Sequence, residues 1–141
     1  MFDDSLSAAL FEEIPNASTG TDEQLARRAT QADAVLPVRV ATVTRETLAD
    51  RVGYTLTLVP TEPAIVGRGP AGPLEVHVSE SSPAFSQLTA TGTAFVGRRL
   101  LLLYRRYDDG GEPKLHFRGE ADTPEVRTAV KNAKSLDDLE R

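Results

Sequence analysis

The two histidines are the residues whose chemistry is easiest to specify. His77 and His116 each lie where polar and apolar residues alternate, so both side chains are expected on the polar face of a β-strand. Imidazole is a common zinc ligand, and Glu75 or Glu120 could supply a third ligand. A small hydrolase or metal-dependent enzyme that uses both histidines is therefore one hypothesis. The simpler interpretation is two solvent-facing histidines with no metal or other cofactor, because no HExxH-like spacing accompanies them.

Other catalytic arrangements find little support in the sequence. The absence of cysteine excludes a disulfide framework, a thiolate zinc site and a cysteine nucleophile. The serines between residues 79 and 86 lack the G-x-S-x-G spacing of a nucleophile elbow. Paired carboxylates can perform acid–base catalysis in a cleft, but the acidic pairs here fall at the termini, on a helix surface or in a turn. We therefore expect a protein that is not an enzyme.

Basic and aromatic residues surround the segment between residues 95 and 107. Arg98-Arg99 and Arg105-Arg106 could line a basic groove, and the aromatic residues nearby could stack on bases. Adjacent residues of a strand point to opposite faces, however, so the four arginines do not form one patch. The net charge of −5 also opposes contact with nucleic acid. We expect surface ion pairs at these arginines and no nucleic-acid partner.

An apolar stripe near the N-terminus is the first candidate for a partner-binding surface. Apolar residues recur at helical spacing between residues 2 and 14, which predicts an amphipathic helix. Turn-forming residues then follow, so residues 1–20 are expected to form this helix and a linker. The apolar face could dock in a groove of a protein partner or pack on the domain itself. The residues expected to contact the partner are Phe2, Leu6, Leu10 and Phe11.

A loop rich in proline and glycine is the second candidate surface. Residues 60–73 contain four prolines and three glycines, which predicts a long loop. This loop is not a phosphate cradle, because it lacks the Lys-Ser/Thr pair of a P-loop and Pro70 has no N–H to donate. Loops on a rigid scaffold often carry binding residues, so we expect Ile65 and Arg68 to contact a protein partner.

The rest of the chain reads as one domain, residues 21–134, followed by a charged tail at residues 135–141 that is expected to fray. Alternating residues predict five strands, and capping residues predict flanking helices. Residues 100–104 are apolar without alternation, which predicts a central strand covered on both faces. The strands are expected near residues 35–44, 53–58, 74–79, 93–107 and 114–118, a hairpin loop at 45–52, and helices near 22–32, 84–88 and 123–134.

The order of strand, strand, strand, short helix, strand and strand resembles that of the OB-fold. Ala32-Asp33-Ala34-Val35 at the first strand, and the run from Val96 to Leu103 before an Asp-Asp-Gly-Gly turn, add to the likeness. Residues 32–120 thus resemble the netrin-like, TIMP-like OB barrels of bacterial extracytoplasmic proteins. The resemblance implies a mainly β (α+β) fold, a five-stranded Greek-key barrel in which the third and fifth strands are neighbours. The periodicity and capping residues add N-terminal helices, a short helix between strands three and four, and a C-terminal helix.

The same resemblance implies where and how the protein acts. Metalloprotease inhibitors of that family use an N-terminal cysteine, which this chain lacks, so that activity does not carry over. We expect a non-catalytic binding or assembly module that contacts a protein partner, in the periplasm or at the outer membrane of a bacterium. A lipoprotein that lacks its leader here is one form of this hypothesis, and a cytoplasmic protein is the alternative. A single-stranded nucleic acid or an oligosaccharide is the alternative ligand, and no apolar run is long enough for a membrane span.

Overall fold

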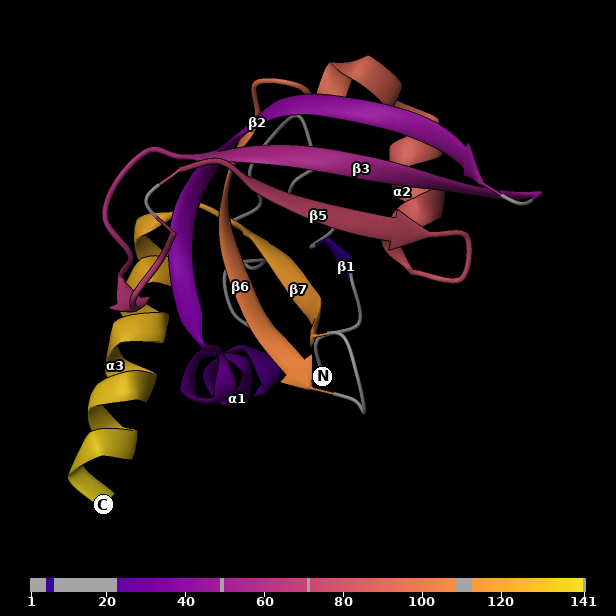
Figure 1. The fold of residues 1–141 in the computed structure, drawn as a ribbon. Coiled ribbons are helices and arrows are strands. Elements are labelled where there is room, and N and C mark those ends of the chain that lie inside the picture. Colours follow the sequence, from indigo (N-terminus) through magenta and orange to yellow (C-terminus); the bar gives the residue numbers. More distant parts are fainter. Residues whose placement is uncertain (1–4, 7–22, 49, 71, 109–112, 141) are drawn as a thin grey trace.

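A strongly bent β-sheet with three α-helices around it makes up the part of the chain that the computed structural model describes (Figure 1). The described residues are 5–6, 23–48, 50–70, 72–108 and 113–140. The strands are β1 (Ser5–Leu6), β2 (Ala34–Leu48), β3 (Arg51–Pro60), β4 (Val66–Gly67), β5 (Leu74–Ser79), β6 (Arg99–Asp108) and β7 (Pro113–Ala121). The helices are α1 (Glu23–Gln31), α2 (Ala84–Thr91), the 3-10 helix η3 (Gly92–Phe95) and α3 (Pro124–Glu140).

The strands follow the order β1-β7-β6-β2-β3-β5, and β4 pairs separately with β2. Every pair is antiparallel except β1 with β7. The third and fifth strands expected from the sequence are β5 and β7, whose Cα atoms come within 8 Å of each other. No ladder joins these two strands in the described part of the chain, so the sheet is not closed. The mainly β, α+β class is confirmed, whereas the five-stranded closed barrel is not.

A bulge in β2 divides the sheet into two parts. The register between β2 and β3 shifts between Val40 and Thr42, which allows the strand to turn there. Before this point β2 pairs with β6, and beyond it β2 pairs with β3 alone. We call the second part the wing, and it consists of residues 42–48 of β2 with β3 and β5. Figure 1 shows the wing extending away from α1 and α3.

The prediction of a hairpin loop at residues 45–52 is wrong. The antiparallel pairing of β2 with β3 continues through the polar residues to the pair Leu48 and Arg51. Only two residues therefore connect the strands, and Asp50 takes a positive φ of 65°. Polar residues are compatible with a strand here because the side chains of Thr44, Arg45, Glu46 and Thr47 are all exposed to solvent.

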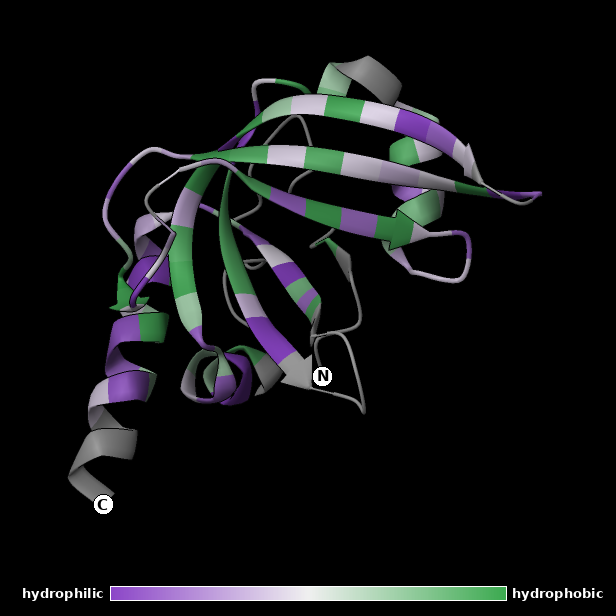
Figure 2. Ribbon diagram, in the orientation of Figure 1, coloured by the Kyte–Doolittle hydropathy of each residue, from purple (hydrophilic) through white to green (hydrophobic). Residues whose placement is uncertain are grey.

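Two apolar cores lie on opposite faces of the sheet. The first is formed by all the long strands together with Leu6, α2 and Phe95. The second lies under α1 and α3, where Leu25 and Val126 contact β2, β4 and β6. Residues of β6 alternate between them, with Leu100 and Leu102 in the first core and Leu101 and Leu103 in the second. The prediction of a central strand covered on both faces is confirmed, and Figure 2 shows that stretch of β6 as continuously apolar.

The N-terminal segment differs from the expected amphipathic helix. Ser5 and Leu6 form strand β1, which lies parallel to β7 opposite Arg118 and Gly119. This extended backbone buries Leu6 to 3% exposure in the first core. The helix predicted there is therefore wrong at these two positions. Its other partner-binding candidates, Phe2, Leu10 and Phe11, lie outside the described residues.

The C-terminal helix is longer than expected. Thr123 caps its first turn, because the Thr123 hydroxyl accepts a hydrogen bond from the Val126 N–H at 3.2 Å. The helix then continues to Glu140, through most of the segment that was expected to fray. The charged residues of this segment suit a solvated helix as well as they suit a tail, so composition does not fix where α3 ends.

Candidate functional site

A hollow of about 390 Å³ lies beneath the proline-rich loop. Leu36 of β2, only 1% exposed, forms its apolar floor, and Gly69 lies so close that a Cβ there would come within 2.9 Å of the Leu36 Cδ1. Arg68 lines the hollow and is exposed to solvent. We call this hollow the loop hollow. Its lining residues are Leu36, Pro60, Glu62, Pro63, Ala64, Gly67, Arg68, Gly69 and Pro70.

The loop that forms this hollow is held on β2 by its backbone. Thr61 donates its N–H to the Pro37 carbonyl at 3.0 Å, and Ile65 donates to the Val35 carbonyl at 2.8 Å. Strand β4 then pairs with β2 where β3 has ended. The sequence did not predict β4, because two residues carry no pattern. The loop is therefore ordered before any partner arrives, which lowers the entropic cost of binding.

Gly67 makes this close approach possible. Its φ is +71°, a conformation that glycine adopts without strain. A Cβ at this position would lie 2.1 Å from the Asp33 carbonyl oxygen, which no real contact tolerates. The position therefore requires glycine for both conformational and steric reasons.

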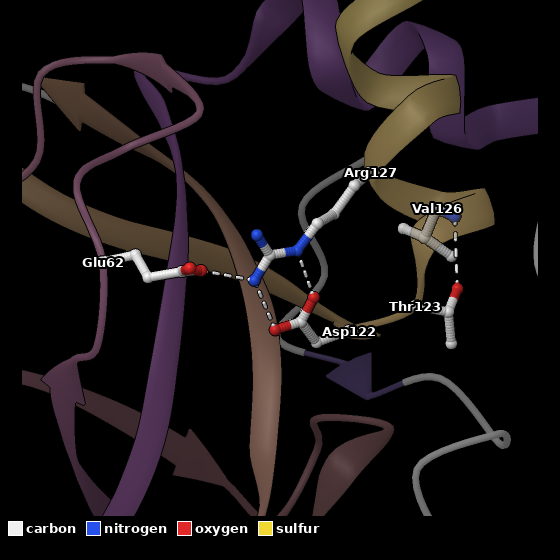
Figure 3. A network of polar contacts seen from close by, with 5 residues as sticks. All are labelled: Glu62, Asp122, Thr123, Val126 and Arg127. Atoms are coloured by element: carbon white, nitrogen blue, oxygen red, sulfur yellow. Dashed lines mark hydrogen bonds and ion pairs between the residues drawn. The ribbon is translucent and has the colours of Figure 1, made fainter.

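Charged side chains fasten the other rim of the loop hollow to α3 (Figure 3). Arg127 donates two hydrogen bonds to the Asp122 carboxylate, at 2.6 and 2.8 Å, and a third to Glu62 at 2.5 Å. The hydrogen bond to Asp122, followed by that to Glu62, raises the pKa of the Arg127 guanidinium above its ordinary value. The Arg127 charge is thus permanent, and it positions the Glu62 carboxylate at the rim.

The two partner-binding candidates of the loop have different surroundings. Ile65 is half-buried and packs against the second core, so its side chain serves mainly to anchor the loop. Arg68 has no ion-pair partner within the described residues and remains available at the surface. The structure therefore leaves Arg68 as the accessible member of the predicted pair.

A second hollow, of about 270 Å³, lies on the wing, and we call it the wing hollow. Three strands supply its polar residues, Glu46 from β2, Thr55 from β3, and His77 and Ser79 from β5. Glu46, Gly53 and Ser79 form one cross-strand row. A Cβ at Gly53 would lie 2.9 Å from the Val78 carbonyl oxygen, so the backbone of β5 passes too close for a larger residue at this position. The sequence prediction missed Glu46 because it lies in the hairpin loop expected at residues 45–52, and it gave Gly53 no role beyond the strand expected at residues 53–58.

His77 is oriented by a neighbouring hydroxyl. Its Nδ1 lies 3.1 Å from the Oγ1 of Thr55, the residue opposite it in the ladder between β3 and β5. The Thr55 side chain is 8% exposed, which makes it one of the few buried polar residues. This contact gives His77 a structural role, because it forms a polar cross-strand pair with Thr55 on the wing.

The two histidines lie opposite different residues of the sheet. His77 lies on β5 opposite Thr55, whereas His116 lies on β7 opposite Arg105. The described residues contain no group of three or more histidine, aspartate or glutamate side chains that could hold a metal ion. Strands β5 and β7 approach each other within 8 Å, but no ladder joins them in the described part of the chain, so the register expected of a closed barrel is absent.

Glu120, once considered as a third metal ligand, has a different role. Its side chain is buried and accepts a hydrogen bond from the Arg118 Nε at 2.9 Å. The buried Arg28 of α1 lies 3.6 Å from the same carboxylate oxygen. Glu120 therefore forms an ion-pair network that connects α1 to β7.

The arginine pairs at the two ends of β6 do not form one basic patch. Arg99 and Arg105 are six residues apart along the strand, a separation of about 20 Å. Arg106 is exposed, and its backbone N–H donates to the Asp33 carboxylate at 2.9 Å.

The described residues include no helix that is both long and apolar enough to cross a membrane. Comparison of the chain with protein-family models, with curated proteins and with solved structures finds no match.

Proposed function

We propose that this protein is a non-catalytic binding or assembly module that contacts a protein partner through the loop hollow. The observation that carries this proposal is the half-buried apolar lining of the loop hollow, Pro60, Ala64 and Pro70, beside the exposed Arg68. Protein interfaces are dominated by a few apolar anchors that fill well-packed pockets, with charged residues at the rim. An apolar side chain of the partner would occupy the hollow, and an acidic group would pair with Arg68.

The lining of the loop hollow favours binding over catalysis. Its two charged residues are Glu62, which is held by Arg127, and Arg68. The remaining residues are proline, glycine, alanine and leucine, none of which supplies a nucleophile or a general base. Such a surface recognises shape and charge without altering its ligand.

We further propose that the fold is an OB-like barrel opened between its third and fifth strands. Five strands, β2, β3, β5, β6 and β7, occur in the expected order, with α2 between the third and fourth. The approach of β5 to β7 at the point where an OB barrel would close supports this relationship. An extracytoplasmic, bacterial location follows from the same resemblance, and cell fractionation with an antibody to the protein would test it.

Exchange of one charge provides the sharpest test of the proposed surface. The partner is first isolated by affinity capture from the native organism and then purified. Arg68→Glu should weaken the affinity for this partner at least about tenfold, because the variant places a negative charge against the partner's acidic group. A tenfold loss corresponds to about 1.4 kcal/mol of binding free energy.

Arg51→Glu is the matched control, because it makes the same charge change in the wing hollow. Affinity within about twofold of the unchanged protein is expected, a difference well below 1 kcal/mol. An affinity that falls only in Arg51→Glu would contradict the proposal and assign binding to the wing. A polar ligand such as an oligosaccharide would then be the better candidate, since that hollow presents hydroxyl and carboxylate groups.

A further inference from the structure

We propose that β1 is an exchangeable strand, which two copies of this chain can donate to each other to form a dimer. The docking of β1 itself supports this proposal. Ser5 and Leu6 lie parallel to β7, opposite Arg118 and Gly119, at the edge of the sheet. This inference is independent of the loop hollow and goes beyond it, because it identifies a second contact surface and its occupant.

Leu6 is the anchor of this contact. Its side chain is 3% exposed and belongs to the first core, on the same face as Leu102. Gly119 stands between Leu6 and Leu102 in the cross-strand row, and both leucines belong to the same buried cluster. Burying a leucine stabilises the bound state, so a groove without β1 would expose apolar surface and require an occupant.

A side-chain amide on α2 recognises the backbone of β1. The Gln87 Nε2 donates a hydrogen bond to the Leu6 carbonyl at 3.2 Å. The other amide atom, Oε1, is buried and has no hydrogen-bond partner among the described residues. The groove that holds β1 therefore combines the backbone edge of β7, an apolar pocket in the first core and the Gln87 amide. All three recognise an extended segment, whether it comes from the same copy or from another.

The position of β1 in the chain permits this exchange. Leu6 belongs to the first core, whereas Leu25 of α1 belongs to the second, so the two segments dock on different faces. Residues 7–22 connect them, a length of sixteen residues that can span up to roughly 50 Å. An exchanged β1 would make the same contacts as the original, which is why strand exchange is an inexpensive route to a dimer.

The absence of cysteine from the sequence allows a direct test with the full chain. Ser5→Cys and Arg118→Cys are prepared as separate variants, since these positions are register partners and paired strands place Cα atoms about 5 Å apart, within reach of a disulfide. The two proteins are incubated together at about 1 mM, near the effective concentration of a tethered segment, and then oxidised. Mass spectrometry of the linked peptides should show residue 5 of one copy joined to residue 118 of the other.

Matched variants decide the result. Ser5→Cys mixed with Thr44→Cys, an exposed wing position, gives the background, and the proposal requires at least a fivefold excess over it. Adding Leu6→Asp to the Ser5→Cys chain should remove that excess of crosslinked product. If far-UV circular dichroism shows that the Leu6→Asp variant does not fold, Leu6→Ala is used in its place.

The double variant Ser5→Cys/Arg118→Cys reports the register within one copy. If it links within the chain while the mixture stays at background, β1 remains in its own copy and the proposal is overturned. If it links neither within nor between chains, the register itself is contradicted and the proposal falls with it. Neither result bears on Arg68, so the loop hollow is tested separately.

Discussion

Glu120 links two parts of the molecule that meet only after folding. It is 5% exposed and lies against Arg118 of its own strand and Arg28 of α1, which is also 5% exposed. Buried ion pairs add little over apolar packing, but removal of one member leaves the other charges poorly solvated. The network therefore constrains which substitutions the interface between α1 and β7 tolerates.

Replacement of this carboxylate should be costly. We expect Glu120→Gln to lower the free energy of unfolding by about 2–4 kcal/mol, because the two guanidinium groups lose their shared negative charge. Denaturation in urea measures this effect. Glu75→Gln, on the exposed face of β5, is the control and should change stability by less than about 0.5 kcal/mol. Equal effects of the two variants would contradict a structural role for Glu120.

Tyr104 gives a pH dependence with a definite sign. Burial raises the pKa of its phenol above the ordinary 10.0, the nearby Arg106 opposes this, and Asp33 adds to it. The folded state thus holds the phenolic proton more tightly than the unfolded state does. The resulting stabilisation is complete below pH 10, and it is lost as the pH rises through the elevated pKa.

Absorbance of tyrosinate during an alkaline titration measures this directly. We expect part of the tyrosinate absorbance to develop above pH 10, and Tyr104→Phe to remove that late part while circular dichroism shows the fold intact. A late part that persists in Tyr104→Phe would contradict the effect of burial on Tyr104.

At the scale of elements, the anchored loop depends on one glycine. Gly67→Ala should lower the free energy of unfolding by at least about 2 kcal/mol, because it adds a backbone clash to conformational strain. Gly97→Ala is the matched control, since Gly97 has a φ of +90° but open space around its Cβ position. The control should cost about 1 kcal/mol, the strain alone. Similar losses in thermal denaturation would show that the clash with Asp33 is relieved.

The sequence predicts long elements well and short ones poorly. The alternation of β5 indicates which of its residues are buried, and that strand lies at the expected residues 74–79. The leucines of β6 lie in a strand as expected, but β6 begins at Arg99 and not near residue 93, because residues 92–95 form η3. Strands β1 and β4 contain two residues each, and their pairing depends on distant segments, which no local pattern records. The extension of β2 was missed because exposed polar residues suit a strand and a loop equally.

The candidate sites show the same division. The loop that carries Arg68 could be predicted from composition, because clustered proline and glycine mark a loop. The Arg68 side chain is exposed, as is usual for a charged residue in a loop. The contact of Arg127 with Glu62 joins residues 65 positions apart and could not be foreseen. The pairing of His77 with Thr55, and the close approach of Gly53 to the Val78 backbone, follow from the register of β3 and β5 alone.

At the scale of the whole molecule, the two cores share their central strands. Val35 and Leu101 belong to the second core, while their chain neighbours Leu36 and Leu102 belong to the first. Neither core can open without disturbing β2 and β6. We therefore expect thermal unfolding in one cooperative transition, with near-UV and far-UV circular dichroism giving the same midpoint. Two separated midpoints would contradict this coupling.

The central ladder also sets the order in which a newly made chain can acquire its structure. Ala34 pairs with Tyr104, 70 residues later in the sequence, whereas β3 and β5 lie close to β2 along the chain. The wing can therefore assemble during synthesis before β6 has been made. Until then β2 has no β6 to pair with, and its apolar residues are exposed to other chains. Long-range pairing of this kind slows folding. The emerging chain has a period of vulnerability to aggregation that ends only when the leucines of β6 arrive.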